Sequence, residues 1–257
     1  MVGTKEGNKE EIYLVKELNK KINTKLWDDL NQDLDNTYAI HITTNKITKL
    51  SNKKVKPKAD VFLAKGTVSK SILENKDYYL SESDFNKLSL RPLDETGISV
   101  KIKGSKKYTI AKLGVETFIR IFDDSEIGCG ASLYTRKESD LLKNELVIKN
   151  WNTTPHTLIN YFNKYFENLK INDLNSIDIL NKIKSKSNEL IIEMTRKNHK
   201  ISNYIYTGIG YFNEPFCAHW FYQDGLIEKN KFFPFRVTTG SGRSRGDFTI
   251  VFKPQKL

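Results

Sequence analysis

The stretch Ile98-Ser-Val-Lys-Ile-Lys103 alternates apolar and polar residues, which predicts a β-strand with one buried face. Because successive side chains of a strand point to opposite faces, Ser99 and Lys101 would share one face. A second strand is predicted at Asp60-Val-Phe-Leu-Ala64, which begins with an acid. An acid and a lysine at the ends of paired strands suit metal-dependent hydrolysis of a phosphodiester: the acid would hold Mg²⁺, and the lysine would offset negative charge. The same pattern is also that of solvated strand-edge residues in a basic protein.

Helices and strands are predicted on both sides of these stretches. Helices are expected over 6–34, 110–122, 137–148, 154–169 and 174–196. Further strands are expected at 38–44, 204–206, 216–222, 231–237 and 248–252, while 69–97 reads as an uncertain connection and 123–135 as a loop. This order predicts an α/β fold, with a core over 1–150 and a helical and β-rich part over 151–257, or one continuous domain.

Composition limits the class of protein. The chain has 257 residues and a formal net charge of +11, with 35 lysines, 7 arginines and 23 asparagines. That charge suits a polyanionic partner, although an A+T-rich coding sequence would produce the same bias. The sequence holds no apolar run of the roughly 18–20 residues that a membrane span needs, and it shows no signal peptide, so we expect a cytoplasmic protein without membrane contact. Two cysteines are too few for a disulfide scaffold or a thiolate zinc cluster.

Positive charge gathers in two places. Six lysines and no acid lie between Asn45 and Lys58. Three of the seven arginines, Arg236, Arg243 and Arg245, lie close together near the C-terminus, the last two in a Gly/Ser-rich loop. Arginine can fork onto guanine in the major groove, so this loop is a candidate for reading DNA, together with Thr238, Ser241 and Ser244. The alternative is a solvated hairpin turn.

Cys217 and His219 lie two positions apart in the predicted strand 216–222. They could be two ligands of one metal ion. Because zinc takes three or four ligands, a packed aromatic strand is the preferred interpretation. A nucleophilic Cys–His pair is unsupported, because nothing in the sequence orients or activates either residue. Gln223 reads either as a base-reading amide or, preferably, as a turn residue.

Several segments resemble monomeric type II restriction endonucleases of the PD-(D/E)xK superfamily, the enzymes that cut CCGG and GCGC. Lys101 to Phe118 resembles the segment after the catalytic lysine of the CCGG cutter, through Lys106-Lys107, Ile110-Ala111 and Val115-Glu116-Thr117. Pro57-Lys-Ala-Asp60 resembles the opening of that enzyme's active site, and 5–12 and 235–254 look like the two ends of the GCGC cutter. The resemblance covers about half the chain, in patches.

The resemblance implies a mixed sheet flanked by helices and a β-rich C-terminal part that recognises DNA. It makes Asp60 the metal-binding acid and Lys101 the catalytic lysine. Ser99 falls where the superfamily has an acid, so Glu11 or Glu10 on the first helix is the expected second ligand of Mg²⁺. The gap of 39 positions between Asp60 and Ser99 is longer than in these relatives, which keeps Asp94 and Glu95 as reserve candidates.

The lysines just past the predicted catalytic strand, Lys103, Lys106 and Lys107, would contact phosphates or bases at the mouth of the site, or else form a solvated basic turn.

The expected function is therefore that of a monomeric, Mg²⁺-dependent restriction endonuclease acting on double-stranded DNA at a short palindromic site with G·C pairs. A cognate DNA methyltransferase would be a genetic but not a physical partner. One alternative is a structure-specific repair or recombination nuclease of the same fold. The other is a non-catalytic nucleic-acid-binding protein in which Ser99 marks a decayed site.

Overall fold

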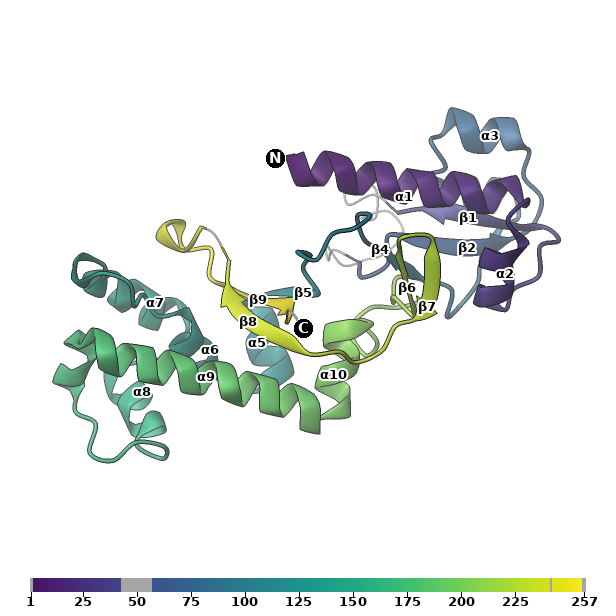
Figure 1. The fold of residues 1–257 in the computed structure, drawn as a ribbon. Coiled ribbons are helices and arrows are strands. Elements are labelled where there is room, and N and C mark those ends of the chain that lie inside the picture. The colour runs from purple at the N-terminus through teal and green to yellow at the C-terminus, as the bar shows by residue number, and fades with distance from the viewer. Residues whose placement is uncertain (1, 43–56, 241, 256–257) are drawn as a thin grey trace. The chain divides into compact units, whose positions relative to one another are not determined.

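A computed structural model describes residues 2–42, 57–240 and 242–255, and Figure 1 shows its fold. The chain is mixed α/β, as predicted. It divides into two compact units, one made of Met1–Lys106 with Tyr206–Phe232 and the other of Lys107–Ile205 with Phe233–Leu257. The predicted boundary near residue 150 therefore falls inside the second unit. Five of the six lysines predicted as a basic run lie in 43–56, outside the described residues.

The first unit is a mixed sheet with helices. Its strand order is β1-β2-β4-β6-β7, with β3 paired to β2, and the β4–β6 pair is parallel whereas the others are antiparallel. The strands are β1 (Thr37–His41), β2 (Val61–Lys65), β3 (Arg91–Pro92), β4 (Ile98–Val100), β6 (Trp220–Gln223) and β7 (Leu226–Lys229). The helices are α1 (Val2–Lys20), α2 (Thr24–Leu30), α3 (Lys70–Asn75) and α4 (Glu82–Lys87).

An apolar stripe explains how α1 packs in this unit. Leu14, Val15 and Leu18 recur at helical spacing and are fully buried, so α1 lies along the sheet beside β1 (Figure 1). The central strand β2 is buried through Val61–Ala64, and its Phe62 ring stacks on Phe85 of α4 at 5.9 Å between centroids. This rigid core holds the start of β2 and the start of β4 side by side.

The second unit combines a small antiparallel sheet with most of the helices. Its strand order is β5-β9-β8, formed by β5 (Ala111–Gly114), β9 (Thr249–Pro254) and β8 (Phe235–Thr239). The α-helices are α5 (Val115–Phe122), α6 (Ser125–Ser132), α7 (Asn144–Asn150), α8 (Pro155–Phe162), α9 (Ile177–Lys197) and α10 (His199–Tyr206), whose last residue belongs to the first unit. Three short 3₁₀ helices are η2 (Glu138–Lys143), η3 (Ile171–Asn175) and η4 (Arg243–Arg245).

Several predicted segments differ in the structure, among them 216–222, of which only 220–222 lie in β6. Residues 110–122 form a strand and then a helix, because Ala111 and Leu113 alternate with exposed or half-buried residues and pair with β9. The predicted strand 204–206 is the end of α10, and the predicted helix 6–34 breaks after Lys20 into α1 and α2. The uncertain connection 69–97 holds α3, α4 and β3.

The predicted loop 123–135 contains the buried helix α6. Its glycines are places of close packing rather than helix breaks: a Cβ on Gly128 would lie 2.1 Å from the Trp151 ring, and one on Gly130 would lie 2.2 Å from the Ser187 hydroxyl. The glycines therefore let α6 approach its neighbours in the second unit.

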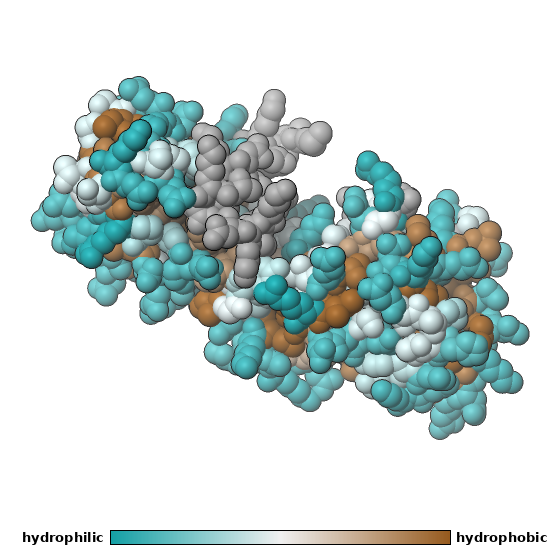
Figure 2. Space-filling view, turned by 180° about the vertical axis from the view of Figure 1, so that it is seen from behind, coloured by the Kyte–Doolittle hydropathy of each residue, from teal (hydrophilic) through white to brown (hydrophobic). Residues whose placement is uncertain are grey.

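Hydrophilic residues cover most of the face shown in Figure 2, and hydrophobic ones interrupt them in patches. In the part of the chain that the structure describes, no helix has the length and apolar character needed to cross a membrane.

Candidate active site

Asp60 lies directly before β2, where the sheet joins it to β4. Its backbone N–H donates to the carbonyl of Ile98 at 2.8 Å. Its side-chain Oδ2 accepts the backbone N–H of Val100 at 2.8 Å and faces the Ser99 hydroxyl at 3.4 Å. The long gap between Asp60 and Ser99 in the sequence therefore does not keep them apart, because α3, α4 and β3 fill it.

Ser99 and Lys101 lie in contact. The Lys101 ammonium donates to Ser99 Oγ at 2.6 Å. Although β4 ends at Val100, the backbone N–H of Lys101 donates to the carbonyl of Tyr222 at 2.9 Å, so the chain stays extended beside β6. The buried Ser99 thus lies between the carboxylate of Asp60 and the ammonium of Lys101.

Glu11 comes to this place from α1. Its Oε2 lies 2.9 Å from Nε2 of His41, a buried side chain at the end of β1. His41 pairs in register with Val61, the residue after Asp60. Glu11 is near enough to Asp60 for its charge to act on that carboxyl, so both predicted metal ligands lie in the same region of the first unit.

Burial and like charge perturb the central acid. Removal from water is the largest cause that raises the pKa of Asp60 to about 6, and the charge of Glu11 adds to it. Lys101, the hydrogen bond from Val100 and His41 act in the opposite direction. A half-buried carboxylate next to another negative charge is a place where a bound cation is favoured.

Lys58 belongs to the same cluster. Burial, followed by the nearby charge of Lys101, lowers the pKa of Lys58 to about 7, while Asp60 acts to raise it. No sequence pattern assigned a role to either Lys58 or His41. A signal was present for Lys58, because it lies two positions before Asp60 and can share its face of the chain.

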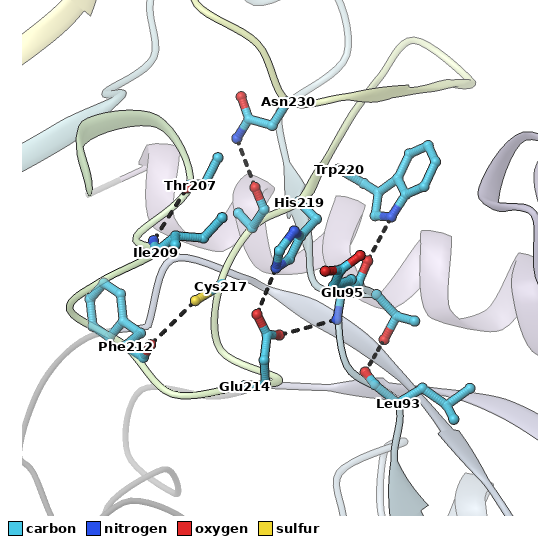
Figure 3. A network of polar contacts seen from close by, with 12 residues as sticks. Leu93, Glu95, Thr207, Ile209, Phe212, Glu214, Cys217, His219, Trp220 and Asn230 are labelled. Atoms are coloured by element: carbon cyan, nitrogen blue, oxygen red, sulfur yellow. Dashed lines mark hydrogen bonds and ion pairs between the residues drawn. The ribbon is translucent and has the colours of Figure 1, made fainter. Parts of the chain in front are cut away.

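The donors fit Mg²⁺. Two carboxylates and a hydroxyl are hard oxygen ligands, and Mg²⁺ typically takes one or two carboxylates and completes its shell with water. Glu10, the other acid considered, is half-buried on α1. Glu95 lies in a different network with Glu214 and Trp220 (Figure 3), and Asp94 is exposed.

The predicted phosphate-contacting lysines follow β4. Lys103, Lys106 and Lys107 have exposed side chains. The turn that carries the first two is fixed by Gln223, whose amide donates to the carbonyls of Ile102 and Ser105 at 3.2 and 2.8 Å. Gln223 is the last residue of β6, so its preferred interpretation as a turn residue was wrong, and its side chain instead holds the turn at 102–105 in place.

The predicted reading loop is anchored at one arginine. Arg243 Nη1 donates to the carbonyls of Ser132 and Leu133 at 2.9 and 3.3 Å, and its guanidinium lies 4.2 Å from the centre of the Tyr134 ring. These carbonyls end α6, where the helix dipole favours positive charge. Lys184 also donates to Leu133, at 2.6 Å. Arg243 thus has partners within its own unit, which a freely projecting base-reading side chain would not have.

The other predicted loop residues are placed differently. Arg236 on β8 and Arg245 on η4 are exposed, and the Thr238 hydroxyl donates to the carbonyl of Val251 at 3.4 Å. Ser241 lies outside the described residues, and the backbone of Ser244 lies within η4. Arg245 is therefore the better placed of the two η4 arginines to reach a ligand.

Comparison with known proteins adds no relative: no family model matches the chain, and no curated protein sequence matches it.

Proposed function

We propose that this chain is a Mg²⁺-dependent endonuclease that cleaves double-stranded DNA at a short palindromic site containing G·C pairs, with a restriction-endonuclease-like PD-(D/E)xK fold and a monomeric state. The observation that carries the proposal is the contact of Ser99 with both Asp60 and Lys101. Glu11 lies near enough for its charge to act on Asp60. An acid at a sheet junction next to a lysine suits metal-assisted phosphodiester hydrolysis, because the acid can anchor the metal and the lysine can offset negative charge on the phosphate.

Each residue has a role in this chemistry. Asp60 and Glu11 would hold Mg²⁺, which when bound polarises the phosphate and lowers the pKa of a coordinated water. His41 orients the Glu11 carboxylate through the contact at 2.9 Å. Lys101, fixed by Ser99, would donate to a phosphate oxygen and offset the charge that develops there. Lys58, with a pKa of about 7, can take up or release a proton near neutral pH.

One observation favours a second candidate function. Ser99 stands at the point where an acid would complete the ligand set, and a neutral hydroxyl is a poorer ligand for Mg²⁺ than a carboxylate. A non-catalytic nucleic-acid-binding protein would keep the basic surface and tolerate this change.

Incubation of bacterial genomic or plasmid DNA with the purified protein and Mg²⁺, followed by mapping of the ends, tests the proposal. We expect discrete fragments with a common end sequence, and we expect Asp60→Asn to bind DNA but not cut it. A smear, or cutting only at junctions, would indicate a structure-specific nuclease. Binding without cutting in either Mg²⁺ or Mn²⁺ would indicate the non-catalytic alternative, and a fully active Asp60→Asn variant would overturn the site.

A further inference from the structure

A second group of metal-ligating side chains lies in the first unit, apart from the Asp60 cluster. The donor atoms of Glu214, Cys217 and His219 all lie within 4.8 Å of one another. His219 Nε2 is 2.6 Å from Glu214 Oε1 (Figure 3). The Cys217–His219 pair was set aside on sequence grounds because zinc needs a third ligand, and the turn before β6 brings Glu214 to that position.

We propose that Glu214, Cys217 and His219 bind a thiophilic divalent cation, with Zn²⁺ as the expected ion. A thiolate, an imidazole and a carboxylate are ligands that Zn²⁺ accepts, and three protein ligands leave a fourth position for water. The all-oxygen donors at Asp60 favour Mg²⁺ instead, so the two sites differ in chemistry. This proposal does not depend on the proposed nuclease activity.

The three ligands are held in place by neighbouring groups. The backbone N–H of Glu95 donates to Glu214 Oε2 at 3.3 Å, which fixes that carboxylate, and the Trp220 indole donates to the carbonyl of Glu95 at 2.9 Å. Asn230 fixes the backbone on either side of the His219 nitrogen. Its own backbone N–H donates to the carbonyl of His219 at 2.7 Å, and its side-chain amide donates to the carbonyl of Ala218 at 3.1 Å. Such outer contacts orient the ligands of protein metal sites.

Access from solvent also fits a bound cation. The side chains of His219 and Glu214 are 18% and 26% exposed, so a cation can enter from solvent, whereas Cys217 is buried. The Cys217 thiol donates to the carbonyl of Phe212 at 3.4 Å. On binding, the Cys217 S–H bond breaks, a Zn–S bond forms and that proton leaves to solvent. The hydrogen bond between His219 Nε2 and Glu214 Oε1 breaks as well, so that each atom can bind Zn²⁺ while the imidazole keeps one hydrogen, on Nδ1.

The site would brace the segment that positions Asp60. The carbonyl of Phe216, between the ligands, accepts the backbone N–H groups of Lys58 and Ala59, both at 3.1 Å. The ligand segment also packs tightly on Gly97, where a Cβ would lie 1.9 Å from the carbonyl oxygen of Cys217. A cation held here would therefore restrain both strand starts that meet at Asp60.

Calorimetric titration of the chelator-treated, full-length protein with ZnCl₂, in a large excess of Mg²⁺, tests the proposal. We expect one Zn²⁺ per chain, and we expect Cys217→Ser and His219→Ala each to weaken binding by more than the roughly 10- to 100-fold that outer contacts contribute. Cys129→Ala and His156→Ala are matched controls, since Cys129 is the other free cysteine and His156 an exposed histidine. They should leave binding unchanged.

Co²⁺ gives a readout that needs no variant. The unsubstituted protein should show a thiolate-to-cobalt charge-transfer band and the visible bands of tetrahedral cobalt. Absence of both the Zn²⁺ heat and the Co²⁺ bands would overturn the proposal, as would a folded Cys217→Ser variant that binds as tightly as the unsubstituted chain.

Discussion

At the scale of single residues, the backbone of Asp60 is held in a place that is unfavourable for its ionised side chain. Its backbone continues the ladder between β2 and β4, so it cannot move away from Ser99 and Lys101. Its carboxyl is nevertheless removed from water and close to Glu11, which raises its pKa to about 6. The residue is thus placed for holding a cation at some cost to the stability of the metal-free fold.

This conflict predicts a pH-dependent gain in stability for Asp60→Asn in the absence of metal. The pKa of Asp60 in the folded state is about 6, above its ordinary value of 3.8, so the folded protein binds the proton more tightly than the unfolded one. The destabilisation is therefore absent below about pH 4 and complete above about pH 6. We expect the variant to be more stable by roughly 1–3 kcal/mol at pH 7.

Urea unfolding in the presence of a chelator, at pH 4 and at pH 7, measures this difference. The advantage of Asp60→Asn should shrink toward zero at the lower pH. In a second series, with Mg²⁺ in place of the chelator, the metal should stabilise only the unsubstituted chain. Equal unfolding free energies for the two proteins at pH 7 would contradict the placement of Asp60.

At the scale of elements, η4 and its flanking loop depend on the end of α6. Arg243 joins them through the carbonyls of Ser132 and Leu133, and it lies against Tyr134. Arg245, two positions on, is exposed. The two arginines, alike in the sequence, therefore have different tasks in the folded chain: one fixes the loop and the other is available to a ligand.

The variants Arg243→Ala and Arg245→Ala should differ accordingly. Loss of Arg243 breaks hydrogen bonds from a charged group and should lower the unfolding free energy by about 1–3 kcal/mol, with weaker binding to all DNA sequences. Loss of Arg245 should leave stability unchanged and remove about 1–3 kcal/mol of discrimination at one base pair. Arg196→Ala, at the exposed end of α9, controls for the lost charge.

Binding to a panel of duplexes that differ at single base pairs, together with urea unfolding, measures both effects. If Arg245→Ala weakens binding to every duplex equally, that side chain contacts phosphate and does not read bases.

Local sequence patterns predicted the parts of the fold that depend on local spacing. The two-residue period of 98–103 gave the shared face of Ser99 and Lys101, and the helical period gave α1 with Glu11 on it. The burial of α6 was missed because its glycines read as loop residues, although they make room for Trp151 and Ser187. Glycine content alone cannot separate a flexible loop from a tightly packed helix.

Long-range pairing accounts for what the sequence could not predict at the sites. The parallel partner of β4 is β6, which comes from the far part of the chain, and no local pattern reports such a pairing. The same holds for His41 beside Glu11, which lie 30 positions apart. The contact between Glu214 and His219 spans only five positions, but it depends on how the backbone turns before β6. The anchoring of Arg243 was missed for this reason too, because it needs the end of α6.

At the scale of the whole molecule, the net charge of +11 is spread over many lysines, and only some of them would contact DNA. Lys103, Lys106 and Lys107 follow the strand that carries Ser99. If DNA lies at that place, these side chains neutralise phosphates and release counterions. The salt dependence of DNA binding would then be set by where the lysines lie in the folded chain, rather than by the total charge of the protein.

Replacing Lys103, Lys106 and Lys107 together by alanine should reduce the slope of log affinity against log salt by up to about 3. The matched control replaces Lys25, Lys87 and Lys200, three lysines that are exposed elsewhere in the chain. Their replacement by alanine removes the same total charge. Fluorescence anisotropy with a short duplex between about 50 and 200 mM salt measures the slope. Equal slopes for the two triple variants would assign the effect to net charge alone.

The chain passes from one compact unit to the other at residues 106–107, 205–206 and 232–233. This interleaving has a consequence for synthesis on the ribosome. The strand at 98–100 must wait for residues 220–222 to emerge before its parallel partner exists, and the small sheet of the second unit waits for residues 249–254. The nascent chain therefore carries an unpaired strand edge through much of translation. Chaperones would act on the chain at this stage, and a truncated gene product would keep the unpaired edge permanently.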